Sequence, residues 1–119
     1  MRTWGFRVTA RGVDEDQNKI LAYSADTGPC DALPRIADEA DLFLCEAALR
    51  SLKEDVPEPE SRGHLLPLEA AEAARAAGAK RLLMTHIPIT DGGEWALSQA
   101  RSVYDGSVEI AEPLRTYEV

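Results

Sequence analysis

The first regular hydrophobic pattern lies at residues 5–11, where apolar and polar side chains alternate. Such alternation is typical of a strand with one apolar and one polar face. After a polar run at 12–18, residues 19–24 are again rich in strand formers. Two strands separated by a polar turn predict an antiparallel hairpin.

Beyond the hairpin, helical and strand-like segments alternate. Continuous apolar runs at 41–45 and 81–85 predict strands buried on both faces. The clearest helix spans 67–77, because Pro67 suits its first turn and Gly78 its C-terminal stop. The other predicted elements are a loop at 25–29, a short helix near 30–39, a solvated loop at 52–63, a helix at 95–104, and strands at 108–110 and 115–119. This order predicts an α/β fold with a mixed sheet and helices on at least one face.

Composition limits the classes of function. The 119 residues suffice for a single domain, and the net charge of −8 does not favour a general nucleic-acid binder. We find neither an apolar run long enough to span a membrane nor an export signal, so we expect a cytoplasmic protein. Cys30 and Cys45 are then expected to be reduced and chemically inert.

Four polar residues stand at or near the ends of predicted elements. Asp26 follows the hairpin, Glu46 and His86 follow the two buried strands, and His64 precedes the clear helix. In layered α/β proteins, ligands bind at strand ends. An aspartate and two histidines are suitable ligands or proton carriers for a metal such as zinc.

Each of these residues also has a simpler interpretation. Asp26 precedes Thr-Gly-Pro, and an aspartate in such a position is often only a turn former or helix cap. His86 could be a hydrogen-bonded residue at a strand boundary, His64 an exposed side chain, and Glu46 the acceptor of a backbone amide. Taken singly, the residues suggest a site without defining it.

In order along the chain, these segments resemble the C-terminal half of the metallo-β-lactamase fold, in its ribonuclease-Z-like and phosphodiesterase-like branch. The resemblance rests on Trp4-Gly5-Phe6-Arg7-Val8, Tyr23-Ser24-Ala25-Asp26-Thr27, Leu44-Cys45-Glu46-Ala47, Gly63-His64-Leu65 and Leu83-Met84-Thr85-His86-Ile87-Pro88. It implies half of an αββα sandwich, with a mixed sheet and helices packed on one face. The whole chain, 1–119, would then be a single domain forming that half.

The resemblance also implies roles for the four residues. Asp26 would bridge two metal ions and His86 would bind one of them. His64, supported by Glu46, would be the catalytic histidine. The complete site would hold two Zn²⁺, with Mn²⁺ possible.

Some positions depart from the family pattern. Ala25 replaces the usual glycine before the aspartate, a mild change if φ is negative there. Cys45 stands where ribonuclease Z has histidine, and Leu66 and Pro67 where a hydroxyl residue is common after His64. Together with the acidic charge, these changes argue against tRNA processing.

The largest departure is the absence of the family's His-x-His-x-Asp-His motif from this sequence. Those residues supply most of the metal ligands, so we expect this chain alone to bind metal weakly, if at all. Its partner would be the N-terminal half of the fold or a second copy of itself.

The resemblance leads to a metal-dependent hydrolase that acts on a small phosphodiester or related ester, with water as nucleophile and only part of the site on this chain. The first alternative is a non-catalytic remnant or interaction module of the same fold that self-associates through its apolar sheet face. The second is a small acidic α/β binding protein unrelated to the family.

Overall fold

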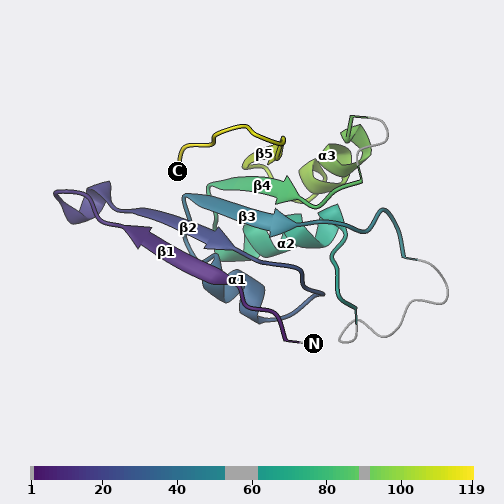
Figure 1. The fold of residues 1–119 in the computed structure, drawn as a ribbon, viewed down its shortest axis with the longest axis horizontal. Coiled ribbons are helices and arrows are strands. Elements are labelled where there is room, and N and C mark those ends of the chain that lie inside the picture. Colours follow the sequence, from purple (N-terminus) through teal and green to yellow (C-terminus); the bar gives the residue numbers. More distant parts are fainter. Residues whose placement is uncertain (1, 53–61, 89–91) are drawn as a thin grey trace.

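A five-stranded mixed sheet organises the chain (Figure 1). The computed structural model describes residues 2–52, 62–88 and 92–119. The strands lie in sequence order: β1 (Phe6–Ala10), β2 (Lys19–Tyr23), β3 (Leu42–Glu46), β4 (Arg81–Thr85) and β5 (Ser107–Ile110). β1 and β2 form an antiparallel hairpin, whereas β2 to β5 pair in parallel.

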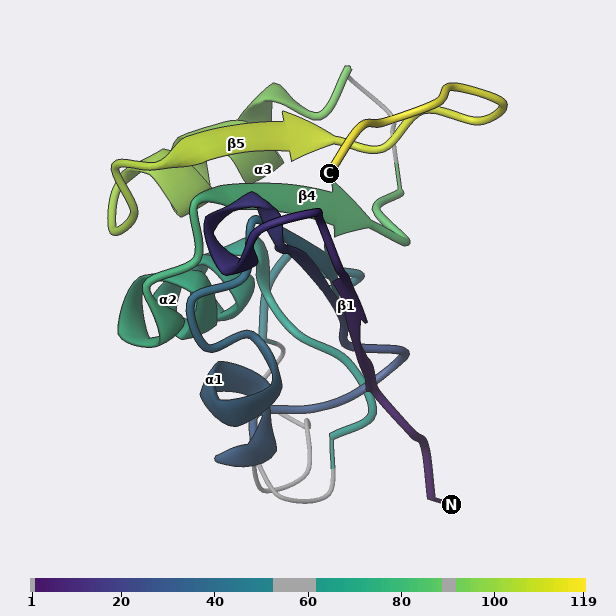
Figure 2. The same cartoon turned by 90° about the vertical axis from the view of Figure 1, so that its left-hand side faces the viewer.

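Helices connect the parallel strands. They are α1 (Ala32–Ile36), α2 (Pro67–Ala77) and α3 (Glu94–Arg101), and a 3₁₀ helix, η1 (Glu15–Gln17), lies within the hairpin turn. Crossovers between parallel strands are right-handed, so three successive crossovers in one direction place their helices on one face. α2 accordingly contacts both α1 and α3, and α1 and α2 lie on the same side of the sheet in Figure 2.

The core lies between this helical layer and the sheet. On the sheet it is formed by alternate residues of neighbouring strands, among them Ala22, Phe43, Leu82 and Val108, which are paired across the sheet and buried. α2 contributes mainly alanines. Small side chains allow the helix to approach the sheet closely, and the Gly78 backbone ends it in the left-handed conformation at φ 68°.

Among the residues that the structure describes, no helix covers the other face of the sheet. Phe6 and Val8 of β1 are more than half exposed on this face, and Leu21, Tyr23 and Leu44 are partly buried. The rings of Phe6 and Tyr23 stack with their centroids 6.4 Å apart. The result is an apolar surface along β1 to β3.

The structure confirms the predicted α/β fold, the hairpin, the buried strands and the main helix. The predicted strand at 115–119 is wrong, because residues 111–119 form no strand. Pro113 lacks an N–H for pairing and Leu114 has φ 63°, so the chain turns away after β5. Most of the predicted loop at 52–63 lies outside the described residues. Within the described part, no helix is both long and apolar enough to cross a bilayer.

Candidate metal centre

The carboxyl ends of β2, β3 and β4 lie side by side, and the four sequence-predicted residues meet there. Asp26 follows β2 in a loop, Glu46 is the last residue of β3, and His86 comes directly after β4. His64 comes from the segment that leads into α2 and reaches the same strand ends. Because β2, β3 and β4 are parallel neighbours, their C-terminal residues necessarily share one edge.

Asp26, His64 and His86 form one cluster. His86 Nδ1 lies 3.2 Å from Asp26 Oδ1, and about half of each of these two side chains is exposed. The His64 and His86 rings meet edge to face, with centroids 5.2 Å apart. One ligand atom from each of the three residues lies within 4.8 Å of the others. Two imidazoles and a carboxylate therefore lie close enough together to be candidate ligands of one metal centre.

Glu46 lies beneath the cluster, and only 1% of it is exposed. Its Oε1 accepts the Thr27 N–H at 3.1 Å and lies 2.9 Å from His64 Nδ1. Its Oε2 accepts the N–H groups of Ala48, at 2.9 Å, and Leu65, at 3.1 Å. The simple interpretation holds, since the carboxylate accepts backbone amides, and the same carboxylate contacts His64, as the functional interpretation requires.

The chain has a left-handed backbone at two places in the site. Ala25 has φ 53° and His86 has φ 63°. The condition under which alanine would be a mild change at position 25, a negative φ, is therefore not met, and the alanine carries strain that the family's usual glycine would avoid. Non-glycine residues in this conformation are uncommon and concentrate at functional sites.

Ser24 supports the strained turn, a role that sequence reasoning missed. The buried Ser24 hydroxyl donates to the Ala25 carbonyl at 2.7 Å and accepts the Glu46 N–H at 2.9 Å. A serine next to a turn commonly bonds local backbone, which is the only signal the sequence offers.

A second carboxylate anchors the segment that carries His64. Glu69 Oε2 accepts the Leu66 N–H at 2.8 Å, and Glu69 Oε1 binds the guanidinium of the buried Arg62. Sequence reasoning also missed this pair, although Glu69 stands at the third helical position of α2, where a glutamate caps the helix start. The segment is thus held on both sides of His64.

Comparison with known proteins identifies the family to which this chain belongs. The profile of the β-lactamase superfamily domain family matches residues 2–87, most of the chain. This chain belongs to the β-lactamase superfamily. The metallo-β-lactamase fold protein YhfI of Bacillus subtilis superposes with a TM-score of 0.67 at 26% identity, covering 91% of this chain and 46% of YhfI. The superfamily member described here therefore has the metallo-β-lactamase fold.

Its curated relatives include ribonuclease Z. The Mycobacterium tuberculosis protein Rv1339 is 37% identical over 98% of this chain, and Myxococcus xanthus ribonuclease Z is 44% identical over 76% of it. The chain spans 40% of the length of the first and 30% of the second. These likenesses confirm the ribonuclease-Z-like resemblance and the metal-dependent hydrolase family.

The donor set of this superfamily member fits a metal ion. Ligands bound about 2.0–2.2 Å from a tetrahedral zinc lie about 3.3–3.5 Å from one another. The 3.2 Å between Asp26 Oδ1 and His86 Nδ1 is close to that spacing. Imidazole and carboxylate are ligands that borderline divalent ions accept, and metal binding is typical of the superfamily.

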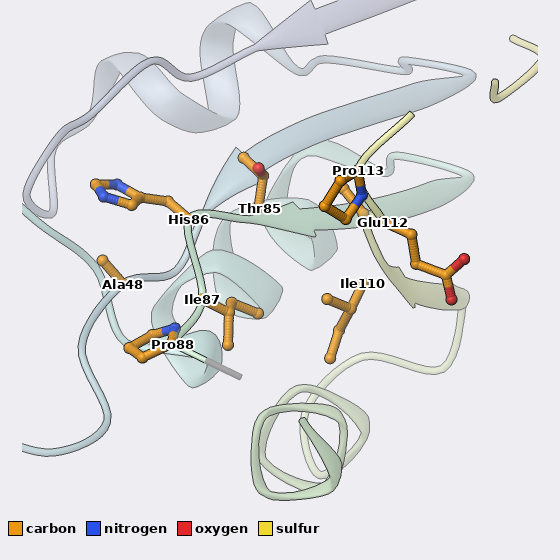
Figure 3. A pocket seen from close by; sticks show the side chains of 9 residues that line it. Ala48, Thr85, His86, Ile87, Pro88, Ile110, Glu112 and Pro113 are labelled. Atoms are coloured by element: carbon orange, nitrogen blue, oxygen red, sulfur yellow. The ribbon is translucent and has the colours of Figure 1, made fainter. Parts of the chain in front are cut away.

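A pocket of about 670 Å³ adjoins the cluster at the ends of β4 and β5. Figure 3 shows His86 at one end and Glu112 at the other, with Ile87 and Ile110 between them. The described residues that line it include no lysine or arginine. Its size is within the range of small-molecule sites.

Neither cysteine belongs to the cluster of Asp26, His64 and His86. Cys45 lies in the core on β3, where burial raises the pKa of its thiol to about 12. Cys30 is exposed, with its Sγ 3.8 Å from the Thr27 hydroxyl. The high pKa makes the Cys45 thiol unreactive near neutral pH, as expected for an inert core residue.

Proposed function

We propose that this chain carries part of the active site of a metal-dependent hydrolase that acts on phosphodiester or related ester bonds. Family membership supports the hydrolase class, and the convergence of Asp26, His64 and His86 supports a site at the strand ends. The observation that carries the proposal is the contact between His64 Nδ1 and the buried Glu46 carboxylate.

Asp26 and His86 are the residues that would hold metal in the complete site. When bound, two divalent zinc or manganese ions would supply Lewis acidity and lower the pKa of the attacking water. Asp26 offers two oxygens for bridging, whereas a neutral imidazole such as His86 binds one ion. The motif absent from this sequence would have to supply the remaining ligands.

His64 would act as the proton donor to the leaving oxygen. An ionised carboxylate can only accept hydrogen bonds, so Glu46 would fix the proton of His64 on Nδ1 and leave Nε2 available to a substrate. A protonated imidazole in that orientation can deliver a proton from Nε2 or stabilise negative charge on the leaving group. Glu46 would act through His64, as a positioning residue.

The pocket beside His86 supports a small substrate. A single ester group at the cluster would leave room for one organic substituent against Ile87 and Ile110. The described lining lacks the cations that a polynucleotide backbone requires, and the chain carries a net charge of −8. A small phosphodiester therefore suits the site better than tRNA.

The open sheet face supports a partner. Phe6, Val8 and Tyr23 present an apolar surface of the kind that normally packs against another layer. We propose that it is covered by the N-terminal half of the fold, with self-association of this chain as the alternative. In either case size-exclusion chromatography of this chain alone would show association through the exposed face, and a clean monomer would contradict the argument that this face needs a cover.

The hydrolase proposal is tested by joining this chain to a polypeptide that supplies the His-x-His-x-Asp-His motif. With bis(p-nitrophenyl) phosphate as substrate, we expect Asp26→Ala and His86→Ala to abolish metal-dependent turnover. His64→Gln should lower kcat by about 10²- to 10⁴-fold for a poor leaving group. The loss should be smaller for p-nitrophenolate, which needs little protonation.

The matched control is Asp16→Asn, which removes an exposed carboxylate from η1. It should leave turnover unchanged. Absence of hydrolysis in the folded, metal-loaded protein would refute the hydrolase proposal. Equal losses in His64→Gln for good and poor leaving groups would refute the proton-donor role and leave the hydrolase assignment standing.

A further inference from the structure

The segment that follows β5 forms no strand and instead lines one side of the pocket beside His86. Ala111, Glu112 and Pro113 form that side. The Ala111 N–H donates to the Met84 carbonyl at 2.8 Å, which keeps the segment beside the end of β4. The pocket therefore has a wall that the polar residues at the strand ends do not supply.

Tyr117 fixes this wall in place. Its hydroxyl accepts the Glu112 N–H at 2.9 Å and donates to the Ile110 carbonyl at 3.3 Å. Leu114, at φ 63°, turns the chain, and Arg115 returns to Glu112 with Nη1 3.2 Å from Oε2. These contacts hold Glu112 in a defined position although 61% of its side chain is exposed.

We propose that this pocket selects the substrate by taking an uncharged, apolar substituent against Ile87 and Ile110, while Glu112 excludes a substituent that carries a second negative charge. The inference rests on the proposed function and names its substrate class. That class is a small phosphodiester or related ester with an aryl or other apolar substituent that bears no further phosphate or carboxylate group. Glu112 is then a residue that determines specificity and takes no part in the chemical step.

His86 connects the pocket to the polar cluster. It lines the pocket and also belongs to the cluster with Asp26 and His64. A phosphoryl group held at the cluster therefore has the pocket as its neighbour on the side of β4 and β5 (Figure 3). Ile87 follows His86 directly in the chain, so the apolar part of the wall begins beside the cluster.

The apolar part of the pocket is preformed. Ile87 and Ile110 are partly buried and pack against the core. A Cβ atom at Gly93 would lie 2.3 Å from Ile110 Cδ1, so the glycine leaves room for the Ile110 side chain. An apolar substituent binds such a wall because both surfaces are removed from water.

The charge at the far end of the pocket acts against anions. Among the described residues that line the pocket, Glu112 is the only carboxylate and none is a lysine or arginine. Arg115 pairs with Glu112 but does not itself line the pocket, so an entering anionic group approaches the carboxylate first. Placing like charges together is a usual means of excluding a wrong ligand.

The test measures the binding of three phosphonates, by calorimetry, to the joined and metal-loaded protein of the turnover experiment. A phosphonate carries a single substituent, so the pocket has one candidate occupant. Phenylphosphonate should bind at least about tenfold more tightly than methylphosphonate, because its ring covers apolar surface. 4-Carboxyphenylphosphonate should bind about fivefold or more weakly than phenylphosphonate, the effect of two like charges in contact near water.

Two variants assign these differences to residues. Ile110→Ala should reduce the preference for phenylphosphonate over methylphosphonate by at least about threefold. Glu112→Gln should restore about fivefold of the affinity for 4-carboxyphenylphosphonate and change that for phenylphosphonate by less than about twofold. The matched control is Glu109→Gln, which removes a carboxylate 3.9 Å from the same Arg115 but outside the pocket lining, and it should leave both ratios unchanged.

Several results would overturn the inference. They are equal affinities for phenylphosphonate and methylphosphonate, tighter binding of the carboxylated ligand, undiminished discrimination in folded Glu112→Gln, or no binding of any of the three. The ligand series on the unaltered protein decides the matter even if a variant fails to fold, which circular dichroism detects. Discrimination without hydrolysis would refute the hydrolase proposal and leave the selectivity of the pocket standing, whereas hydrolysis without discrimination would refute the selectivity alone.

Discussion

Replacing Glu46 by glutamine is the sharpest perturbation of the site, because it changes one atom of a buried side chain and keeps its shape. In the native protein both carboxylate oxygens accept hydrogen bonds, from Thr27 and His64 on one side and from Ala48 and Leu65 on the other. An amide can accept on one side only. Its NH₂ group must face two native donors.

The loss of stability in Glu46→Gln depends on which hydrogen-bond donors lose their acceptor. If the NH₂ faces Ala48 and Leu65, two backbone N–H groups are orphaned. If it faces Thr27 and His64, the imidazole can change tautomer and accept, so that one backbone N–H is orphaned. Each orphaned buried amide costs about 1–3 kcal/mol, and the remaining bonds lose their charge. We therefore expect Glu46→Gln to lower the free energy of unfolding by about 2–4 kcal/mol.

Urea unfolding followed by circular dichroism measures this difference, and the melting temperature should fall by about 3–6 °C per kcal/mol. The matched control is Glu72→Gln on the exposed side of α2, which should change stability by less than about 0.5 kcal/mol. If Glu46→Gln lowered the free energy of unfolding by less than about 0.5 kcal/mol, the four hydrogen bonds of Glu46 would not hold the site loops together.

Three further predictions concern stability and reactivity. Ala25→Gly should raise the free energy of unfolding, measured in urea, by about 0.5–1 kcal/mol. Glycine relieves about 1–2 kcal/mol of strain at φ 53°, which exceeds the entropy that glycine costs on folding. A lower free energy of unfolding in the variant would contradict this prediction. A hydrogen bond from Lys80 lowers the pKa of Asp41 in the folded protein. The ionised carboxylate therefore stabilises the folded state when the pH is above about 4, the pKa of Asp41 in the unfolded chain. This contribution disappears as the pH falls through the lower pKa of the folded state. Asp41→Asn should therefore cost about 1 kcal/mol near neutral pH, because Lys80 is largely exposed and screened. The difference in unfolding free energy between the two proteins should shrink as the pH falls below the unfolded pKa. In the native chain near neutral pH a thiol reagent should modify the exposed Cys30 and spare Cys45, whose pKa burial raises to about 12; rapid modification of both would show that the core opens.

The fold was largely predictable because its signals are local. Alternation at 5–11 and the apolar runs at 41–45 and 81–85 specify strands by their own periodicity. Pro67 and Gly78 mark both ends of α2 by backbone preferences that act within one helical turn. Within the described residues the tail at 115–119 was misassigned, since its strand-like composition says nothing about whether β5 offers it a partner.

That these candidate residues would lie together could be predicted from the sequence, but the geometry of their contacts could not. Strand ends indicated Asp26, Glu46 and His86, whereas the contact of Glu46 with the Thr27 amide joins positions 19 residues apart. Such a contact depends on the register of neighbouring strands, which local pattern does not determine. The left-handed backbone of Ala25 was missed for a related reason, because tertiary contacts impose it against the preference of the residue.

The strain at Ala25 and the hydrogen bonds of Glu46 act on the same loop. The left-handed Ala25 costs about 1–2 kcal/mol and would relax if its loop were free. Four hydrogen bonds to one buried carboxylate, at about 1 kcal/mol or more each, are enough to offset that cost. These hydrogen bonds connect the Asp26 loop, the end of β3 and the His64 segment to the Glu46 carboxylate. The relative positions of Asp26 and His64 therefore depend on Glu46, which is not itself one of the proposed metal ligands.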